Sequence, residues 1–425
     1  MYGANGTEPA RDPSLKICMV NSYFPPWRGG AETYVHELSK ALAARGHEVM
    51  VLCTSDPLKP GTYDVEGVRV RRLRQLTRLY GTPIQAGLLR ELHDCDADIF
   101  HANFPSPYLA FTVAAASFFR KIPAVITWHN DLPPVTSGAR ILIETHNRLI
   151  LPQYIPRYRR IIATSETYRK KSPILSSLGP RVQVINNGVD CQRFRPGLDP
   201  SSIEAKYGLS GRFVVLFVGA LTKWHGYKGL DVLLKAMRIC IKSSPNVFLL
   251  IVGDGDLKPH YESMAHNLGI ANHIIFAGDA SAEDLPKFYT ASSLLALPSK
   301  DMSEGFGLTL LEANASGRPC IASNTGGIPE VIREGYNGRL VPPNDARALA
   351  QGILSLAKDV DVRRRLGENG RRVALTHDWK MVAEDTENAY LTSIASGKNQ
   401  SETQADAVTL NTHGNSILKH VFVGF

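Results

Sequence analysis

The sequence predicts an α/β protein with two doubly wound parallel sheets, each forming a domain of its own. Two series of short apolar strands alternate with helical patterns, the first starting near residue 16 and the second near residue 213. A segment rich in proline, glycine and aspartate, residues 188–211, separates the two series. The length of 425 residues agrees with this division, because it suits two domains of about 150 to 200 residues each.

The first domain opens with a strand, a glycine-containing loop, a helix and a second strand. Residues 17–20 are all apolar, which is typical of a parallel strand buried on both faces. The loop that follows contains Gly29 and Gly30, where the backbone can come close to a ligand because no Cβ is present. We expect a helix over 33–44 and then a strand over 49–53. Further short strands are expected at 99–101, 124–128, 160–164 and 182–185.

The second domain repeats this alternation of strands and helices. Its expected strands lie at 213–218, 247–252, 274–276, 294–297 and 320–322, with helical patterns such as 230–241 between them. Ligands of doubly wound sheets bind at the carboxyl ends of the strands. We therefore expect one shared site in the cleft between the two domains.

The same patterns set the predicted boundaries along the chain. The segments are, in order, a disordered N-terminus at 1–14, the first domain at 15–187, the hinge at 188–211, the second domain at 212–378, a last helix at 379–396 and a flexible tail at 397–425. The tail is polar and then weakly apolar, and it contains no motif that we can interpret.

The composition is that of a globular protein, with 44% apolar and 21% charged residues. The longest uncharged, mostly apolar run, Pro107 to Phe119, is shorter than the ~20 residues that a membrane-spanning helix needs. The N-terminus is polar and lacks the apolar core of a signal peptide, so we expect a cytoplasmic protein. The six cysteines are scattered without a C-x-x-C pair, which favours reduced structural thiols and no zinc site.

Positive charge is concentrated in the first half of the chain. The net charge of the whole chain is +8, and the densest basic stretch contains Arg69, Arg71, Arg72, Arg74 and Arg78. A solvated strand edge would explain these arginines, and so would contact with an anionic membrane or a phosphorylated acceptor. A nucleic-acid partner is disfavoured, because no binding motif and no interleaved aromatic residues accompany the charge.

The most informative stretch is Glu304-Gly305-Phe306-Gly307-Leu308-Thr309-Leu310-Leu311-Glu312. Its two carboxylates flank a glycine-rich turn that opens a short helix over 308–316, closed by Gly317. At a rise of about 1.5 Å per residue they lie roughly 12 Å apart, so they must hold two different parts of one long ligand. The free N–H groups of the first helical turn would hold a diphosphate between them. A nucleotide sugar has this layout.

With these residues the chain resembles the retaining glycosyltransferases of family 4, which have the GT-B fold and carry two glutamates separated by seven residues. The supporting motifs are, in order, Gly29-Gly30-Ala31-Glu32, Trp128-His129, Asn187-Gly188-Val189-Asp190, Lys228-Gly229, Gly253-Asp254-Gly255, the Glu304 to Glu312 segment and Gly326-Gly327-Ile328-Pro329-Glu330. The resemblance covers most of the chain. It implies two Rossmann-like domains that face a central cleft, the first binding the acceptor and the second the nucleotide sugar, with the last helix crossing back.

The resemblance assigns each acidic residue its own part of the donor. Glu304 is expected to accept hydrogen bonds from hydroxyls of the donor sugar, and Glu312 to bind the ribose hydroxyls. Backbone N–H groups near Gly307 and Leu308 would face the phosphates. The expected substrate-binding residues further include Gly29, Gly30, Gly305 and Phe306.

The remaining expected site residues are one histidine and two lysines. His129 matches the family's active-site histidine, which contacts the transferred sugar. Lys228 precedes a helix, so its ammonium group and the helix dipole both favour a diphosphate. Members of the family usually carry an arginine at the position of Ala220, and Lys223 is our first candidate to replace it.

The expected reaction is transfer of a hexosyl group to an acceptor hydroxyl. A retaining glycosidase needs its two carboxyl groups about 5 to 5.5 Å apart, which Glu304 and Glu312 do not satisfy. On the resemblance we favour a front-face displacement, in which the leaving phosphate helps to deprotonate the acceptor. Of two Asp-x-Asp patterns, the one at 94–96 is expected to be a solvated turn and the one at 254–256 to shape the nucleotide pocket. We expect no cofactor and no essential metal.

Other functions stay open on the sequence. A sugar phosphorylase would depend on orthophosphate, and a nucleotide-sugar epimerase would turn over without an acceptor alcohol. A non-catalytic subunit that binds sugar nucleotides is favoured only by the missing arginine at Ala220. The acceptor is expected to be a glycan, a lipid-linked sugar or a polysaccharide precursor, while the base, the sugar and the linkage are not set by the sequence.

Overall fold

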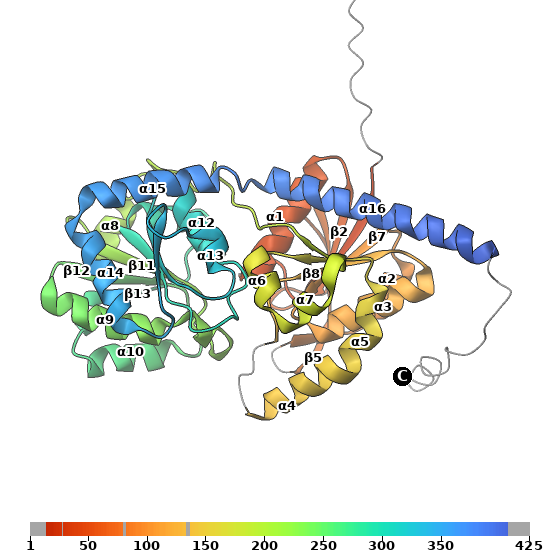
Figure 1. Ribbon diagram of the computed structural model, residues 1–425, viewed down its shortest axis with the longest axis horizontal. Coiled ribbons are helices and arrows are strands. Elements are labelled where there is room, and N and C mark those ends of the chain that lie inside the picture. The colour runs from red at the N-terminus through yellow and green to blue at the C-terminus, as the bar shows by residue number, and fades with distance from the viewer. Residues whose placement is uncertain (1–13, 28, 80–81, 133–136, 407–425) are drawn as a thin grey trace, which may run out of the picture.

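The computed structural model describes residues 14–27, 29–79, 82–132 and 137–406 and contains two α/β domains (Figure 1). The N-terminal domain occupies the right of Figure 1 and the C-terminal domain the left. Each has a mainly parallel sheet with helices on both faces, and a large cavity is lined by both domains. The predicted fold class is therefore confirmed. The predicted N-terminal segment 1–14 lies outside the described residues apart from residue 14 itself.

The N-terminal sheet has the strand order β10-β9-β8-β7-β1-β2-β4-β3. Its strands are β1 (Lys16–Val20), β2 (Glu48–Thr54), β3 (Gly61–Val65), β4 (Val68–Leu73), β7 (Ile99–Phe104), β8 (Ala124–Trp128), β9 (Arg160–Ala163) and β10 (Val182–Val184). All of these neighbours pair in parallel except β3 and β4. The chain order reverses at β1, which lies between β2 and β7, and ligands of such sheets bind at the carboxyl ends beside that reversal.

The helices of this domain cover both faces of its sheet. They are α1 (Gly30–Ala44), α2 (Leu88–Asp94), α3 (Pro107–Arg120), α4 (Ser137–Thr145), α5 (Leu151–Tyr154), α6 (Glu166–Lys171) and α7 (Pro173–Ser177). Ile17 and Met19 of β1 pack with residues of α1, whereas Cys18 and Val20 pack with residues of α2 and α3. Successive side chains of β1 thus enter two different cores, which is why the whole strand is apolar.

The basic stretch belongs to β4 and to a hairpin that the sequence did not predict, β5 (Gln75–Leu79) with β6 (Thr82–Gln85). Three of its five arginines have partners inside the protein. Arg71 pairs with Glu91 at 2.7 Å and Arg78 with Asp56 at 2.5 Å. Arg72 is buried and donates to the backbone carbonyl of Pro25. Arg72 is the one buried member of the five, so the expected solvated edge holds for the exposed Arg69, Arg74 and Arg78 but not for Arg72.

The C-terminal sheet is entirely parallel, with the order β13-β12-β11-β14-β15-β16. Its strands are β11 (Phe213–Val218), β12 (Val247–Val252), β13 (Ile274–Gly278), β14 (Leu294–Leu297), β15 (Cys320–Ser323) and β16 (Gly338–Val341). Its helices are α8 (Ser201–Tyr207), α9 (Leu230–Ser243), α10 (Lys258–Asn267), α11 (Leu285–Thr290), α12 (Leu308–Ala315), α13 (Ile328–Val331), α14 (Ala346–Lys358) and α15 (Val360–Ala374). The order reverses at β11, so the carboxyl end of β11 is the expected ligand position.

The last helix, α16 (Trp379–Asp406), crosses from the C-terminal domain to the N-terminal domain and packs on α1 (Figure 1). Trp379 lies against Gly188, where a Cβ atom would come within 2.7 Å of the indole ring. Farther along, the buried Glu387 accepts from Arg45 at 2.5 Å. The helix runs past the predicted end at residue 396, so the first ten residues of the predicted tail are helical, and 407–425 lie outside the described residues.

Replacing Trp379 by alanine should weaken the packing of α16 on the rest of the protein and so lower the free energy of unfolding. The side chain is 6% exposed and its ring lies 5.9 Å from that of Tyr34. Loss of a large buried side chain costs about 3 to 5 kcal/mol. Chemical denaturation followed by circular dichroism should show this loss for Trp379→Ala. The control Met381→Ala removes a side chain on the same helix that is 52% exposed, and equal losses in the two variants would contradict the packing described.

Candidate active site

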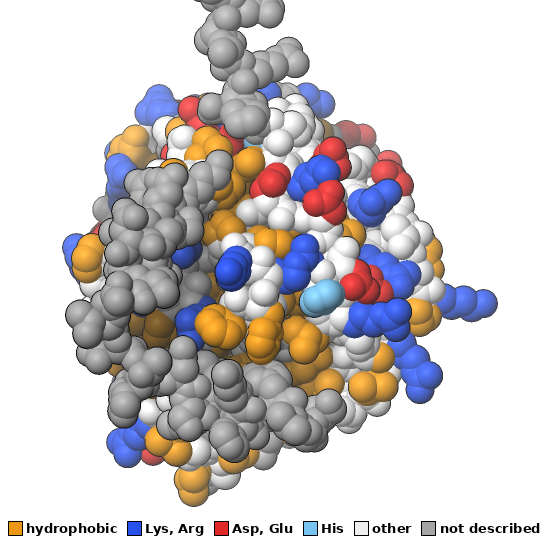
Figure 2. Space-filling model, turned by 90° about the vertical axis from the view of Figure 1, so that its right-hand side faces the viewer, with side chains coloured by type: hydrophobic (Ala, Val, Ile, Leu, Met, Phe, Trp, Pro, Cys, Tyr) orange, Lys and Arg blue, Asp and Glu red, His pale blue; other side chains and the backbone are white. Residues whose placement is uncertain are grey.

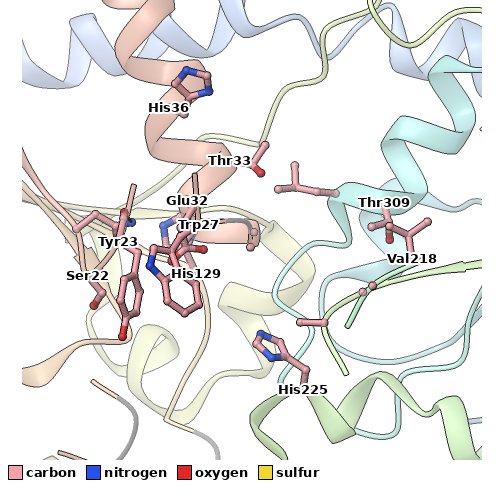
Figure 3. A pocket seen from close by; sticks show the side chains of 18 of the residues that line it. Ser22, Tyr23, Trp27, Glu32, Thr33, His36, His129, Val218, His225 and Thr309 are labelled. Atoms are coloured by element: carbon pink, nitrogen blue, oxygen red, sulfur yellow. Dashed lines mark hydrogen bonds between the residues drawn. The ribbon is translucent and has the colours of Figure 1, made fainter. Parts of the chain in front are cut away.

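A single cavity of about 1930 Å³ lies between the two domains at the carboxyl ends of both sheets (Figure 3). Small-molecule sites usually occupy about 300 to 1,000 Å³, so this cavity has room for two substrates. The strand ends at β1, β7 and β8 supply one wall, and those at β11 and β12 supply the other. All of the sequence-predicted site residues except Lys223 line this cavity.

A buried ion pair occupies the C-terminal wall. The Lys228 Nζ donates to Oε2 of Glu304 at 2.9 Å, and the Ser299 hydroxyl lies 3.5 Å from the same oxygen. Burial alone would lower the pKa of the Lys228 amine, but the nearby Glu304, Tyr227 and Glu312 outweigh burial and raise that pKa above its usual value. The largely buried lysine is therefore a permanent cation at neutral pH.

The conformation of Lys228 depends on the glycine that follows it. Gly229 has a φ of +74°, and a Cβ there would lie 2.0 Å from the carbonyl oxygen of Pro298. The side-chain stem of Lys228 crosses Gly219, where a Cβ would lie 2.9 Å from Cδ of the lysine. Only glycine at these two positions lets the turn close and the lysine lie flat against the end of β11.

The loop that carries Glu304 packs by its backbone between two other segments, one at Gly327 and the other at His129. Gly327 donates its N–H to the Glu304 carbonyl at 2.9 Å, and a Cβ on Gly327 would lie 1.9 Å from the carbonyl oxygen of Gly305. On the other side, a Cβ on Gly305 would lie 1.7 Å from the carbonyl oxygen of His129 in the N-terminal domain. These approaches fix the position of Glu304 relative to His129.

Helix α12 starts directly after this loop with its N-terminus at the cavity. Gly307 precedes it with a φ of +94°, and Leu310 donates its N–H back to the Gly307 carbonyl at 2.9 Å. Leu308 and Thr309, in the first turn, line the cavity, and the Thr309 hydroxyl is buried without a hydrogen-bond partner among the described residues. Phe306 lines the cavity as well but also belongs to the buried core of the C-terminal domain. The free N–H groups of this first turn make it a site for an anion.

Glu312 lies within α12 and lines the same cavity as Glu304, which precedes this helix. The hydroxyl of the buried Tyr289 donates to Oε2 of Glu312 at 2.5 Å. Burial raises the pKa of Glu312 to about 7, although the hydrogen bond from Tyr289 and the charge of Arg193 act in the opposite direction. Both carboxylates thus face one cavity, with the Lys228 amine close enough to respond to each.

His129 stands at the end of β8 on the N-terminal wall. Its Nε2 lies 3.0 Å from Oδ1 of Asn103, whose amide nitrogen in turn donates to the carbonyl of Val20. With Nε2 donating to Asn103, Nδ1 remains an acceptor. Burial lowers the pKa of His129 to about 3, so the imidazole is neutral at pH 7. The ring of Tyr34 packs edge-on against it, with centroids 4.8 Å apart.

A glutamate on the N-terminal wall had no assigned role in the sequence interpretation. Glu32 lines the cavity, and its carboxylate folds over Gly29, where a Cβ would lie 2.2 Å from Oε2. Burial raises the pKa of Glu32. A Cβ on Gly30 would lie 3.9 Å from Leu308 of the other domain. The signal for Glu32 was present, because it closes the Gly29 to Glu32 motif.

The expected substitute for the missing arginine does not reach the cavity. Lys223 begins the short helical turn η4 (Lys223–Lys228), and its Nζ lies over the ring of Trp224 at 5.5 Å from the centroid. Ala220, Trp224 and His225 line the cavity instead. Figure 3 shows the imidazole of His225 pointing into the space between the domains. Spacing within a turn could not tell which of these side chains faces inward.

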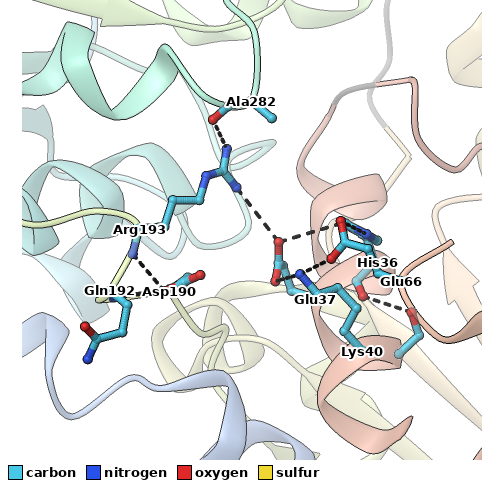
Figure 4. Close-up of polar contacts among 9 residues, drawn as sticks. His36, Glu37, Lys40, Glu66, Asp190, Gln192, Arg193 and Ala282 are labelled. Atoms are coloured by element: carbon cyan, nitrogen blue, oxygen red, sulfur yellow. Dashed lines mark hydrogen bonds and ion pairs between the residues drawn. The ribbon is translucent and has the colours of Figure 1, made fainter. Parts of the chain in front are cut away.

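A network of charged side chains lines part of the cavity (Figure 4). Arg193, in the segment between the domains, donates to the carbonyl of Ala282 at 2.9 Å and lies 3.9 Å from a carboxylate oxygen of Glu37 in α1. Lys40 pairs with Glu66 at 2.5 Å beside it. The described residues contain no group of three or more His, Cys, Asp or Glu side chains arranged to hold a metal.

Two Rossmann-like domains that face each other across a shared cavity are the architecture of the GT-B class of glycosyltransferases. The family model described as Glycosyl transferases group 1 matches residues 201–373, and the model described as Glycosyltransferase Family 4 matches residues 28–193. The chain belongs to glycosyltransferase family 4.

The relatives agree with this membership. The GDP-mannose-dependent alpha-(1-6)-phosphatidylinositol monomannoside mannosyltransferase of Mycolicibacterium smegmatis is 29% identical over 404 residues, covering 90% of this chain and 99% of the relative. The structure of sucrose-phosphate synthase from Thermosynechococcus elongatus has a TM-score of 0.73 at 24% identity and covers 90% of this chain and 100% of its own. The Anabaena protein HepE with UDP-glucose has a TM-score of 0.71 at 22% identity, covering 89% and 100%.

The raised pKa of Glu312 predicts that nucleotide affinity falls with decreasing pH. If the ionised carboxylate binds the ribose hydroxyls, a proton must leave Glu312 below pH 7 before the nucleotide binds. Between pH 8 and pH 6 the affinity for the matching nucleoside diphosphate should drop by about tenfold from this cause. The ratio of wild-type to Glu312→Gln affinity, measured by calorimetry, cancels titration of the phosphates. A ratio that does not change with pH would contradict the prediction.

Proposed function

We propose that this glycosyltransferase is a retaining hexosyltransferase that uses a nucleoside diphosphate sugar and needs no essential metal. One observation carries the proposal: Glu304, Lys228, Glu312 and the first turn of α12 face a single cavity. The cation and the helix N-terminus suit a diphosphate, and the carboxylate at each end suits hydroxyl groups. His129 faces them from the acceptor domain.

The proposed chemistry is a front-face displacement. The bond from the anomeric carbon to the leaving phosphate oxygen breaks while the bond to the acceptor oxygen forms on the same face, and the acceptor proton passes to the leaving phosphate. Lys228 and the α12 N–H groups stabilise the charge that develops on that phosphate. Glu304 and Glu312 are occupied by Lys228 and Tyr289, which favours roles in binding over nucleophilic attack.

The donor that we propose to test first is GDP-mannose, which the name of the Mycolicibacterium relative specifies. UDP-glucose is the second choice, because HepE binds it in a similar fold. Thermal shift with free GDP, UDP and ADP separates the bases, and turnover with the matching sugar nucleotides then separates the sugars. Dependence of turnover on orthophosphate would indicate a phosphorylase instead, and full loss of turnover in chelator would refute metal independence.

The acceptor side of the cavity has an apolar wall, which supports an acceptor with an apolar part. The residues of this wall come from the β5–β6 hairpin, α3 and the α4 region, and they are Leu79, Ile84, Tyr108, Leu132, Leu142 and Ile143. A lipid-linked sugar has both a hydroxyl for transfer and an apolar portion for such a wall. We therefore propose a lipid-linked acceptor ahead of a free glycan or a polysaccharide precursor.

Replacing Glu304 by glutamine should abolish transfer without unfolding the protein. The amide keeps the size of the side chain but loses the charge that pairs with Lys228 and accepts from sugar hydroxyls. We expect turnover to fall by about 100-fold or more, which is the scale for removing one precisely placed polar group. Asp301→Asn, in the same loop but exposed, should leave turnover unchanged. Normal turnover in Glu304→Gln, with either donor, would remove Glu304 from the site.

We further propose that the N-terminal domain contacts an anionic membrane from the cytoplasmic side. Exposed apolar side chains gather on α4 and the adjoining turn η1 (His146–Ile150), and they are Ile141, Leu142, Leu149 and Ile150. Arg148 is exposed beside them. Figure 2 shows that hydrophobic and basic side chains also adjoin each other at the outer end of this domain. None of the helices in the described part of the chain has both the length and the hydropathy of a membrane span.

Vesicle sedimentation tests this contact. The protein should bind vesicles of phosphatidylcholine mixed with phosphatidylglycerol and not phosphatidylcholine alone, since each basic residue near an anionic surface contributes about 1 kcal/mol. The double change Leu149→Asp with Ile150→Asp should release it. Leu375→Asp, an equally exposed position on the C-terminal domain, should not. Equal sedimentation of the two variants would refute the location of the surface.

A further inference from the structure

We propose that His225 binds the diphosphate of the donor beside Lys228, in the role that the arginine missing at Ala220 would otherwise fill. The inference rests on the proposed function and adds a residue that neither the sequence motifs nor the relatives assign. It also explains how a family 4 site can work with a single lysine on its phosphate wall.

The first support is the position of the ring. Turn η4 follows β11, whose carboxyl end marks the place where this sheet receives its ligand. His225 lines the cavity from this turn together with Lys228, and its ring points toward the opposite domain (Figure 3). A group at this place meets the same part of a ligand as Lys228 does.

The second support is the hydrogen bond that orients the ring. Nδ1 of His225 lies 2.8 Å from the hydroxyl of Thr222, and the His225 N–H also donates to the Thr222 carbonyl at 2.9 Å. When the hydroxyl donates to Nδ1, the ring proton resides on Nε2. Nε2 is then a fixed N–H donor for a phosphate oxygen, so no ordering of a long flexible side chain is needed on binding.

The charges around His225 favour an anion at this point. Burial and, to a smaller extent, the Lys228 ammonium together lower the pKa of His225 to about 4, while Asp256 of the loop after β12 acts in the opposite direction. The ionisable groups that act on Lys228 are Tyr227 of the same turn, Glu304 of the facing loop and Glu312 of α12. A diphosphate adds negative charge beside both His225 and Lys228, so it receives either a neutral N–H donor or an imidazolium.

The neighbouring lysine supplies a matched comparison. Lys223 lies in the same six-residue turn, yet its amine sits over Trp224 and its backbone N–H donates to Asp256 at 3.1 Å. It has the greater formal charge but does not line the cavity. If facing the cavity matters more than formal charge for binding the diphosphate, replacing His225 must lower the diphosphate affinity and replacing Lys223 must not.

Calorimetric titration with a nucleoside, its monophosphate and its diphosphate tests the inference, using the base that the wild-type protein prefers. His225→Ala should weaken diphosphate binding by about 10- to 100-fold, the range for a hydrogen bond to a charged group, and leave nucleoside binding unchanged. His225→Arg should restore the diphosphate affinity, and Lys223→Ala should match the wild type. Lys228→Ala should also lose diphosphate affinity and serves as the positive control.

Other results would contradict either the role of His225 or the proposed function. Unchanged diphosphate affinity in His225→Ala, or an equal loss for the nucleoside, removes His225 from the phosphate site. A loss in Lys223→Ala alone gives the role to that lysine. If the wild-type protein and Lys228→Ala both fail to bind any nucleoside diphosphate, the proposed function itself fails, independently of His225. Should His225→Ala not fold, His225→Gln, which keeps an N–H donor at similar length, replaces it and should retain most of the affinity.

Discussion

The site depends on one steric constraint, the stack of backbone formed by Gly327, Gly305 and His129. Each step of this stack is too close for a Cβ atom, and the last step crosses from one domain to the other. Glu304 is therefore placed by main chain and not by its own flexible side chain. Such placement is accurate while the two domains are in contact, because packed peptide planes have almost no freedom to shift. Gly305 and Gly327 fix the path of the backbone, and this path determines where the neighbouring Glu304 side chain lies.

The charged side chains of the site are paired with one another. Lys228 and Glu304 satisfy each other at 2.9 Å, so neither is left as an unpaired buried ion. On the proposed roles, a donor that enters exchanges this pair for contacts of equal strength, with phosphate for the lysine and sugar hydroxyls for the glutamate. The site therefore selects ligands that offer both groups. A ligand that offers only one of them leaves either Lys228 or Glu304 buried without a partner.

Much of the fold could be predicted because a parallel strand with two buried faces is apolar throughout, as residues 17–20 show. The β3 to β6 region could not, because its arginines suggested a solvated edge, and Arg72 is buried only by virtue of a carbonyl at Pro25 that lies far away in sequence. Helix α1 also starts three residues before the expected position, since Thr33 donates its N–H to the Gly29 carbonyl at 3.0 Å.

The same contrast holds within the site. Glu304 and Glu312 could be placed at one site from sequence, because one precedes and the other lies within the short helix that the glycine-rich turn opens. His225 could not, because direction within the turn η4 is decided by the bond to Thr222 and by glycines at 219 and 229, none of which spacing reveals. The partners Asn103 and Tyr289 were missed for a similar reason, since they come from other strands and helices and are ordinary in their own segments.

The crossing of α16 has a mechanical consequence. Two separate stretches of chain join the domains, 185–212 between β10 and β11 and 375–378 between α15 and α16, and they meet where Val189 donates to the carbonyl of His377 at 2.7 Å. Two adjacent connections act as a hinge. The domains can rotate about the axis that passes through both connections, but rotation about other axes is resisted. A swing of this kind would separate Gly305 from His129 at the far lip and leave Trp379 seated on Gly188 near the axis. Opening to release product and closing to align the reactants are then the two directions of one movement.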